Sequence, residues 1–484
     1  MVYLSFEGGL EESMVVNQEL ADWVEERRER FISISDQIWA HPQVALAEQF
    51  ACDLQARELE QDGFRITRNV GDMPTAFVAE WGSGKPVVGF LGEYDALPGL
   101  SQEAEPAKHP VNAGGPGHGC GHNLLGTASL AAASAVKAWL EATGKPGTVR
   151  YYGCPAEETG AGKVFMARAG VFDDLDAAIT WHPGGQNTVW LGSSLAIDHL
   201  TFRFHGKTAH AAGAPHLGRS ALDAVELMNI GVNFMREHMI EKARIHYVIT
   251  NGGGAPNVVP DEAEVWYFVR APERDQVDEL SARVRTIAKA AAMMTETELE
   301  ERDIYGIHNY LPNKALTDVA YHILQELGTI EFTDDERSFA QTIIDGYPAG
   351  PRQATLRALE LPDDAKDKPL LGEVFPARDE GKTMSGSTDV SEVSWIAPTV
   401  QVTTTCWALG IPGHSWGITA TGGMSIGHKG MLHAAKTMGL TASEIYSDPE
   451  LLAKAKAEHQ ELMKNREYKV AVPEGMKPPE PRGE

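Results

Sequence analysis

Acidic, thiol and imidazole side chains stand directly after short apolar runs of the sequence. Such runs are typical of buried parallel strands, and ligand sites in open α/β sheets form just beyond the carboxyl ends of strands. We therefore expect the side chains that follow these runs to converge in one cleft. They are Glu93 and Asp95 after the run 86–91, Glu157 and Glu158 after the run 148–153, and His182 after the run 177–181.

Cys120 and His122 form a further group in the glycine-rich segment GHGCGHN, directly before an expected helix. The flanking glycines allow both side chains to turn toward one point. Thiolate, imidazole and carboxylate ligands together suit Zn²⁺ or another divalent transition metal. The sequence therefore predicts a metal site.

Each of these features also has an ordinary interpretation. Cys120 alone would more often be a small buried residue. The glycines could form a phosphate loop, but neither a Gly-Lys-Ser/Thr nor a GxGxxG ending is present. Glu157 and Glu158 could be the solvated start of a helix, where the helix dipole favours acidic residues. Their joint placement at strand ends favours a metal site over coincidence.

The elements that must position these residues alternate between strand and helix as far as residue 193. Helices are predicted over 16–37, 48–61 and 124–142, and the apolar runs are the strands. Strand, helix, strand, helix, strand predicts parallel strands covered by helices.

After residue 193 the pattern becomes β-α-β-β-α-β, which is typical of a ferredoxin-like module. Its first strand, 200–204, alternates apolar and polar residues, so we expect this strand to be half exposed. The other predicted elements are strands at 245–250, 262–270 and 295–302 and helices at 220–239 and 276–294.

The remaining chain is predicted to return to the first domain. We expect loops with one or two helices over 329–385, a glycine-rich loop over 410–423, a helix over 428–438 and an extended tail in the Pro-rich last twenty residues. The predicted fold class is α/β: a catalytic domain with a mixed sheet between helices, formed by residues 15–195 and 311–462, and an inserted ferredoxin-like domain, 196–310. Residues 1–14 and 463–484 are predicted tails.

Composition excludes several classes of protein. The chain has 484 residues, 43% of them hydrophobic, and a formal net charge of −26, which speaks against overall disorder and against a nucleic-acid or membrane-surface binder. No apolar run reaches the ~20 residues of a membrane span. The first fourteen residues carry acidic side chains and no basic segment, unlike a secretory signal. Four cysteines without disulfide-scaffold spacing fit a reducing cytoplasm.

Seven long segments give the chain a family resemblance that spans about residues 31–440. The sequence resembles the amidohydrolase branch of the di-metal aminoacylase/carboxypeptidase metallopeptidase family. This resemblance implies two divalent metal ions per subunit and identifies the inserted domain as a lid and dimerisation domain. The segments are EYDALPGL, HGCGHNLLGT, YGCPAEE, GVFDDLDAAITWHP, AHAAGAPHLGRSALDA, PNVVPDEAE and SIGHKGMLHAAKTM.

The resemblance also assigns roles to individual residues. It implies that Glu157 is the general base and that Asp95 is the acidic residue held beside a ligand. His428 competes with His414 for the last ligand position, and we prefer His414 because His428 lies inside the expected helix. The implied metal ligands are Cys120, His122, Glu158, His182 and His414.

In the inserted domain the resemblance implies that His210 reaches the site of a neighbouring subunit and that Asn257 and Arg270 hold substrate. The ordinary interpretations are a surface histidine, a turn before Pro260 and a strand-end arginine paired with Glu264 or Asp261. Trp181 and Trp190 are expected to be packing residues.

Two positions depart from the family pattern. Asn123 stands where an aspartate is usual, which weakens the local negative field, and Gly413 stands where a leucine is usual before the last ligand. Neither change removes a ligand.

The implied activity is hydrolysis of the amide bond of an N-acyl or N-aroyl amino acid. The resemblance favours Mn²⁺, whereas a thiolate ligand favours Zn²⁺. The expected partners are a small carboxylate substrate and either a second copy bound through the lid or a related subunit. The alternatives are an aminoacylase or dipeptidase with another substrate, and a non-catalytic partner subunit that only binds metal.

Overall fold

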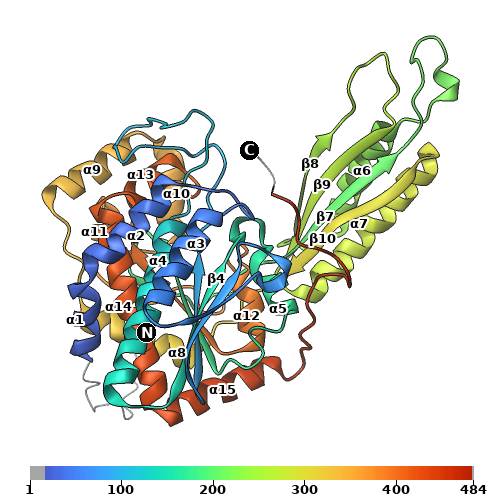
Figure 1. Cartoon of the computed structure of the whole chain (residues 1–484). Coiled ribbons are helices and arrows are strands. Elements are labelled where there is room, and N and C mark those ends of the chain that lie inside the picture. Colours follow the sequence, from blue (N-terminus) through green and yellow to red (C-terminus); the bar gives the residue numbers. More distant parts are fainter. Residues whose placement is uncertain (1–16, 482–484) are drawn as a thin grey trace, which may run out of the picture.

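The computed structural model describes residues 17–481 as a large body from which a smaller lid projects (Figure 1). The body contains a seven-stranded sheet and the lid a four-stranded sheet. The body strands are β1 (Arg65–Arg68), β2 (Phe77–Ser83), β3 (Val87–Glu93), β4 (Gly147–Cys154), β5 (Ala177–Gly184), β6 (Thr188–Val189) and β11 (Thr399–Thr405).

The body sheet has the order β1-β2-β4-β3-β5-β11-β6. Strands β4, β3, β5 and β11 are parallel to their neighbours in this group, while β1, β2 and β6 pair antiparallel, so the predicted mixed sheet is confirmed. Every residue of β3 and β11 is buried, as expected for strands covered on both faces.

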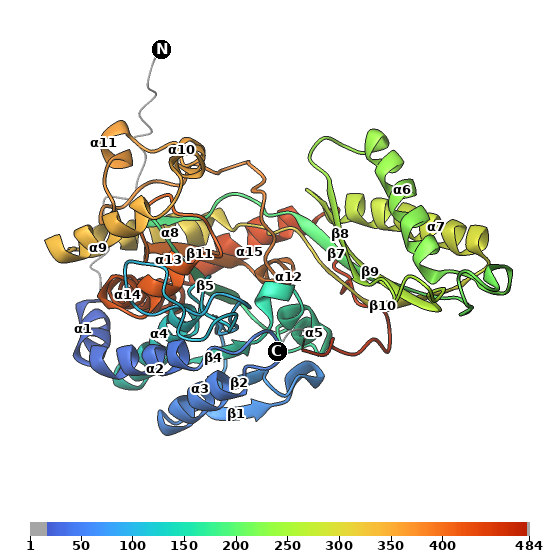
Figure 2. The same ribbon diagram turned by 90° about the horizontal axis from the view of Figure 1, so that it is seen from above.

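Helices cover both faces of this sheet (Figure 2). Neighbouring residues of one strand serve different cores: Tyr151 packs in the cluster of α4 and α14, and Tyr152 in the cluster of α5 and α12. The body helices are α1 (Gln18–Glu26), α2 (Arg28–Ala40), α3 (Gln49–Gln61), α4 (His122–Thr143), α5 (Gly162–Arg168), α8 (Lys314–Leu327), α9 (Asp334–Asp345), α10 (Ala349–Ala358), α11 (Asp363–Lys366), α12 (Val390–Ile396), α13 (Trp416–Gly422), α14 (Ser425–Ser447) and α15 (Pro449–Met463).

The lid has the predicted β-α-β-β-α-β order and an antiparallel sheet in the order β10-β7-β9-β8. Both lid helices lie on one face of this sheet (Figure 2). Its elements are β7 (Ala196–His205), α6 (Ala221–Met235), β8 (Arg244–Asn251), β9 (Glu262–Ala271), α7 (Arg274–Thr295) and β10 (Glu298–Ile307).

The half-exposed first lid strand was a wrong expectation. In β7 only Arg203 and His205 are partly exposed, because the strand lies inside the sheet and its second face is also covered. His199 on that face stacks against Tyr305, whose hydroxyl donates a hydrogen bond to the Thr159 carbonyl of the body. The junction between lid and body therefore buries this face.

Three further expectations are corrected. The helix expected over 16–37 is divided, because α1 ends at Glu26 and α2 begins at Arg28, with Arg27 outside helical geometry at φ −107° and ψ 14°. The segment 329–385 contains three helices. The expected loop 410–423 contains the buried helix α13, which the packing of Ile418 and Ala420 stabilises although its sequence is rich in glycine.

The C-terminal segment is extended, but it is packed on the protein rather than loose. Tyr468 donates a hydrogen bond of 2.7 Å to Glu392, and the Gly306 N–H donates one of 2.7 Å to the Ala471 carbonyl at the end of β10. Arg168 of α5 donates to the Met476 carbonyl. The segment therefore ties the lid junction to the body. The predicted N-terminal tail, 1–14, lies outside the described residues.

Candidate metal centre

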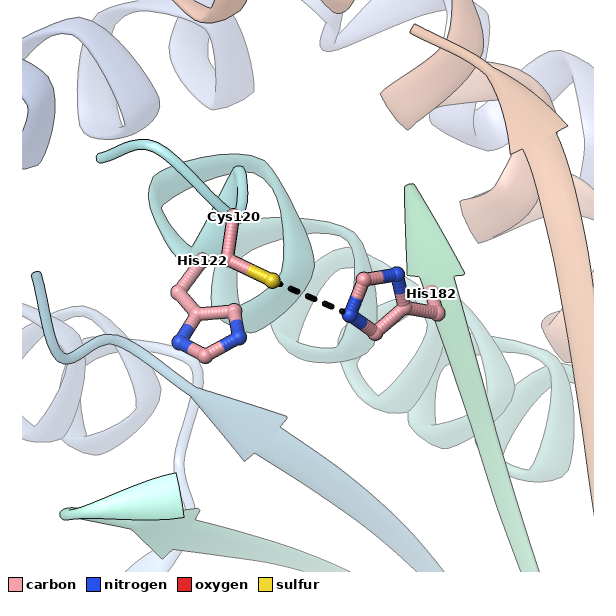
Figure 3. Close-up of side chains that lie close together, drawn as sticks. All are labelled: Cys120, His122 and His182. Atoms are coloured by element: carbon pink, nitrogen blue, oxygen red, sulfur yellow. Dashed lines mark hydrogen bonds between the residues drawn. The ribbon is translucent and has the colours of Figure 1, made fainter. Parts of the chain in front are cut away.

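The parallel strands bring the predicted ligands to one edge of the body sheet. The end of β3 lies beside the end of β4, with Glu93 opposite Cys154, and Glu157 and Glu158 follow on a 3₁₀ turn. Cys120 and His122 lie at the start of α4. Figure 3 shows Cys120 pointing toward the ring of His182 on β5, with His122 beside them; Cys120 Sγ lies 3.4 Å from His182 Nε2.

Two groups of potential ligands share Cys120. In one group the ligand atoms of Cys120, His122 and His182 lie within 4.8 Å of one another, and in the other those of Cys120, Glu158 and His414 do so. His414 Nε2 lies 3.4 Å from a Glu158 carboxylate oxygen. The competing residue, His428, instead faces Asp36 with its Nε2 at 2.8 Å, so the geometry favours His414.

Hydrogen bonds orient both histidine rings. The carboxylate of Asp95 accepts a bond of 2.9 Å from His122 Nδ1, and the Pro183 carbonyl accepts one of 2.7 Å from His182 Nδ1. Each ring therefore presents Nε2 as the unprotonated atom toward Cys120, which is how second partners prepare histidine ligands. Asp95 also accepts from the Glu158 N–H at 2.9 Å and so fixes the backbone of a second candidate ligand.

The donor set fits divalent cations. His122 Nε2 and Glu158 Oε1 are buried and have no hydrogen-bond partner among the described residues. Burial, and after it the charges of Glu93 and Glu158, raises the pKa of Glu157 well above its usual range, and burial raises the pKa of Glu158 to about 7. A cation would compensate this buried negative charge and satisfy the orphaned ligand atoms.

Asn123 does not take part in this group. Its amide donates to Ser35 Oγ and to the Gly422 carbonyl, both at 3.0 Å, so it links α4 to α2 and α13. The orientation of His122 is set by Asp95 rather than by position 123.

Sequence reasoning missed a buried charge cluster below Glu157. Lys163 Nζ lies 2.6 Å from Glu93 Oε1 and 2.5 Å from Asp389 Oδ1, and all three side chains are buried. Glu93 Oε2 in turn lies 3.5 Å from His122 Nε2, and Glu93, His122 and Glu157 form a third group of potential ligands. Of the cluster, only Glu93 had a sequence signal, its place after an apolar run.

Glu48 is a second residue without a sequence signal. Its carboxylate accepts hydrogen bonds from the Leu46 N–H at 2.8 Å and the Ala156 N–H at 2.9 Å. Ala156 precedes Glu157 and has a φ of 58°, a conformation that is strained for a residue with a side chain. Glu48 therefore holds the turn that presents Glu157.

His210 and Asn257 lie at the outer end of the lid. They follow β7 and precede β9 at the sheet end opposite the junction with the body (Figure 1). The Ala211 N–H donates to the Asn257 carbonyl at 3.0 Å, and His210 Nδ1 accepts from Ala212 and Gly213. The structure brings these two residues together, but on the lid rather than beside Cys120.

Arg270 lies on the lid face that carries no helix, near the junction with the body. Alternate residues of β9 are buried under the helices, and Arg270 belongs to the other set. Its guanidinium lies 5.3 Å from the Phe268 ring centre, and its Nε has no hydrogen-bond partner among the described residues. Glu264 is held by Arg203 at 2.9 Å instead, so the ordinary pairing of Arg270 with Glu264 is not formed.

Comparison with known proteins decides the family. The peptidase dimerisation domain family of the M20 peptidases matches residues 196–295. The chain is 47% identical over 468 residues to one of the subunits of p-aminobenzoyl-glutamate hydrolase from Escherichia coli K12, covering 94% of this chain and 97% of that protein. The chain belongs to the M20 metallopeptidase family. The predicted family is thereby confirmed, and this M20 metallopeptidase is a metal-dependent hydrolase of amide bonds.

Two further M20 relatives extend the comparison. The Xaa-Arg dipeptidase of Mus musculus is 32% identical over 336 residues, covering 66% of this chain and 74% of that protein. A dinuclear metal-binding peptidase of the M20 family from Bacillus subtilis has the same fold, with a TM-score of 0.54 at 17% identity over 87% of this chain and 99% of that one. Within residues 17–481 this M20 metallopeptidase has no helix that is long and apolar enough to cross a membrane.

Proposed function

We propose that this chain hydrolyses p-aminobenzoyl-glutamate to p-aminobenzoate and glutamate. The observation that carries this proposal is the complete buried donor set around Cys120 with Glu157 beside it, in a chain 47% identical to a protein named for this reaction. A non-catalytic partner subunit is disfavoured, since such a chain has no need to keep both the donors and the adjacent carboxylate.

The residues would hold two divalent ions that share the thiolate of Cys120. His122 and His182 would complete one site, and Glu158 and His414 the other. We propose Mn²⁺ on the family likeness and Zn²⁺ as the second candidate, because a soft thiolate favours it. When bound, such ions lower the pKa of a water molecule and polarise the substrate carbonyl.

Glu157 is the proposed general base. Its carboxylate lies 3.9 Å from His122 Nε2 at the inner wall of the metal centre. From there it can take a proton from the attacking water and return it to the leaving amide nitrogen. Glu48 supports this role by holding the turn before Glu157, and Asp95 by fixing the ring of His122.

The lid is proposed to hold the carboxylate end of the substrate. Arg270 offers a guanidinium without an ion-pair partner among residues 17–481, and a planar guanidinium matches a carboxylate well. Bulk attraction of an anion by a chain of net charge −26 is unfavourable, so a local positive group is needed. Asn257 is proposed to assist from the outer end of the lid.

His210 is proposed to complete the site of a second copy. The edge strand β8 exposes Tyr247, Val248 and Ile249, and an edge strand can pair across a two-fold axis. Because His210 lies at the outer end of its own lid, an opposite copy is the site that it can reach. A related subunit in place of the second copy is the alternative partner.

The test is hydrolysis by the purified single chain. With added Mn²⁺ or Zn²⁺, we expect release of p-aminobenzoate from p-aminobenzoyl-glutamate at a higher kcat/KM than hydrolysis of N-acetyl amino acids or dipeptides. Preference for a dipeptide would favour the activity for which the 32% identical mouse relative is named. No turnover of any of these amides by the metal-loaded chain would contradict the proposal.

A further inference from the structure

A cavity of about 620 Å³ opens beside His182. Its size falls in the range of ~300–1,000 Å³ that is usual for small-molecule pockets. His182 and Pro183 form one end, Trp407 to Ile411 form part of the wall, and the segment 375–385 covers the other side. The cavity therefore begins at a proposed metal ligand and extends away along the β6 edge of the body sheet.

Two indole rings flank His182 at the mouth of this cavity. The ring centres of Trp190 and Trp407 lie 6.2 and 6.4 Å from that of His182. Trp190 donates a hydrogen bond of 2.7 Å to Thr403 Oγ1, which fixes its ring in place. Trp190 is thus a wall of the cavity and not only a packing residue, whereas Trp181, buried and bonded to the Leu125 carbonyl, is packing as expected.

The charged residues of the cavity are engaged with one another. Lys382 Nζ lies 2.9 Å from Glu360, and Arg378 donates to the Glu360 carbonyl. Asp379 accepts from the Leu191 N–H at 3.2 Å. With these groups satisfied, the wall nearest His182 offers aromatic and aliphatic surface rather than a receptor for a charged group.

We propose that this cavity receives the aromatic acyl group of the substrate, with Trp190 and Trp407 as its specificity-determining residues. The inference rests on the proposed function. An N-aroyl amino acid has a charged end, which needs a cation, and an uncharged ring, which needs apolar walls. Arg270 on the lid suits the first, and the cavity beside His182 suits the second, so the scissile bond lies between them at the metal centre.

Gly185 provides a way to fill the cavity without disturbing the backbone. It lies on the cavity wall and is not among the glycines with positive φ. A Cβ there would meet Leu409 at 3.6 Å and Trp407 at 3.7 Å, which is ordinary van der Waals contact. Gly350 of α10 is the matched control, because a Cβ there meets nothing within 4 Å and Gly350 does not line the cavity.

The experiment measures binding of p-aminobenzoate to the metal-loaded protein by calorimetry, with acetate as the small carboxylate. We expect p-aminobenzoate to bind more tightly than acetate, Gly185→Leu to weaken it at least about tenfold, and Gly350→Leu to leave it unchanged. Trp190→Leu should weaken it as well and serves if Gly185→Leu does not fold. In kinetics, the preference for p-aminobenzoyl-glutamate over N-acetyl-glutamate should fall in the same variants.

Two outcomes would overturn the inference. One is equal binding of p-aminobenzoate and acetate by the unaltered protein. The other is unchanged p-aminobenzoate affinity in folded, metal-loaded Gly185→Leu and Trp190→Leu. Failure of the proposed function would look different: no amide would be turned over, while p-aminobenzoate would still bind and still be excluded by Gly185→Leu.

Discussion

Lys163 Nζ lies 2.6 Å from Glu93 Oε1 in a part of the body where both side chains are buried. Asp389 contacts the same ammonium group from its other side at 2.5 Å. Two carboxylates with one ammonium leave this buried cluster with one net negative charge, next to His122 and Glu157. The cluster thus sets the charge and the position of the inner wall of the metal centre.

Replacement of this lysine should destabilise the protein strongly. Lys163→Met leaves Glu93 and Asp389 buried without a cation, which costs about 3–5 kcal/mol in the free energy of unfolding. Lys137→Met is the control, because Lys137 pairs with Glu141 on the exposed surface of α4 and its loss should cost about 0.5 kcal/mol or less. Urea unfolding measures both, and similar stabilities of the two variants would contradict this role of Lys163.

Removal of the proposed base should separate turnover from metal binding. Glu157→Gln keeps the shape of the side chain but cannot accept a proton, so kcat should fall by at least ~10²-fold. Metal content by elemental analysis and thermal unfolding should stay close to the unaltered protein. A variant with nearly full kcat would show that another group is the base.

Loss of the shared thiolate should lower metal content. Cys120→Ser replaces the atom common to both ligand groups by a hydroxyl, a poor ligand for a soft divalent ion. We expect fewer than two ions per chain after dialysis, against two in a Cys52→Ser control, whose thiol is buried away from these groups. Unchanged stoichiometry would make Cys120 a structural residue only.

Mixed dimers should recover activity if His210 acts in a second copy. Glu157→Gln and His210→Ala chains are each expected to be nearly inactive alone. In a mixed dimer one site combines the intact His210 of one chain with the intact Glu157 of the other. After complete subunit exchange, random pairing should restore about a quarter of the unaltered activity. No recovery with confirmed exchange would exclude action between subunits.

The ligands could be predicted because their sequence neighbours are informative. Glu157, Glu158 and His182 follow apolar runs that fold as buried parallel strands, and such strands end at one edge of a sheet. Lys163 could not be predicted in this way, because its partners are 70 and 226 residues away in the sequence. A lone lysine in a helix is ordinarily solvated, and only the three-dimensional pairing explains its burial.

Helix α13 shows the same limit for local structure. Glycines and β-branched residues give 410–423 little helical propensity, but tertiary packing overrides it. Gly423, just after this helix, approaches Trp39 so closely that a Cβ would lie 2.5 Å from its ring. The glycines there serve close packing, a reason that the local sequence does not reveal.

The insertion of the lid between β6 and β11 also sets an order for biosynthesis. Strand β11 pairs with both β5 and β6, so the body sheet cannot close until Thr405 has left the ribosome, after the whole lid has emerged. At ~5–20 residues per second, the edge of β5 with His182 waits on the order of ten seconds or more for its neighbour. His414 emerges later still. The nascent chain can therefore fold its lid first, and it can gather the full set of metal donors only when translation is nearly complete.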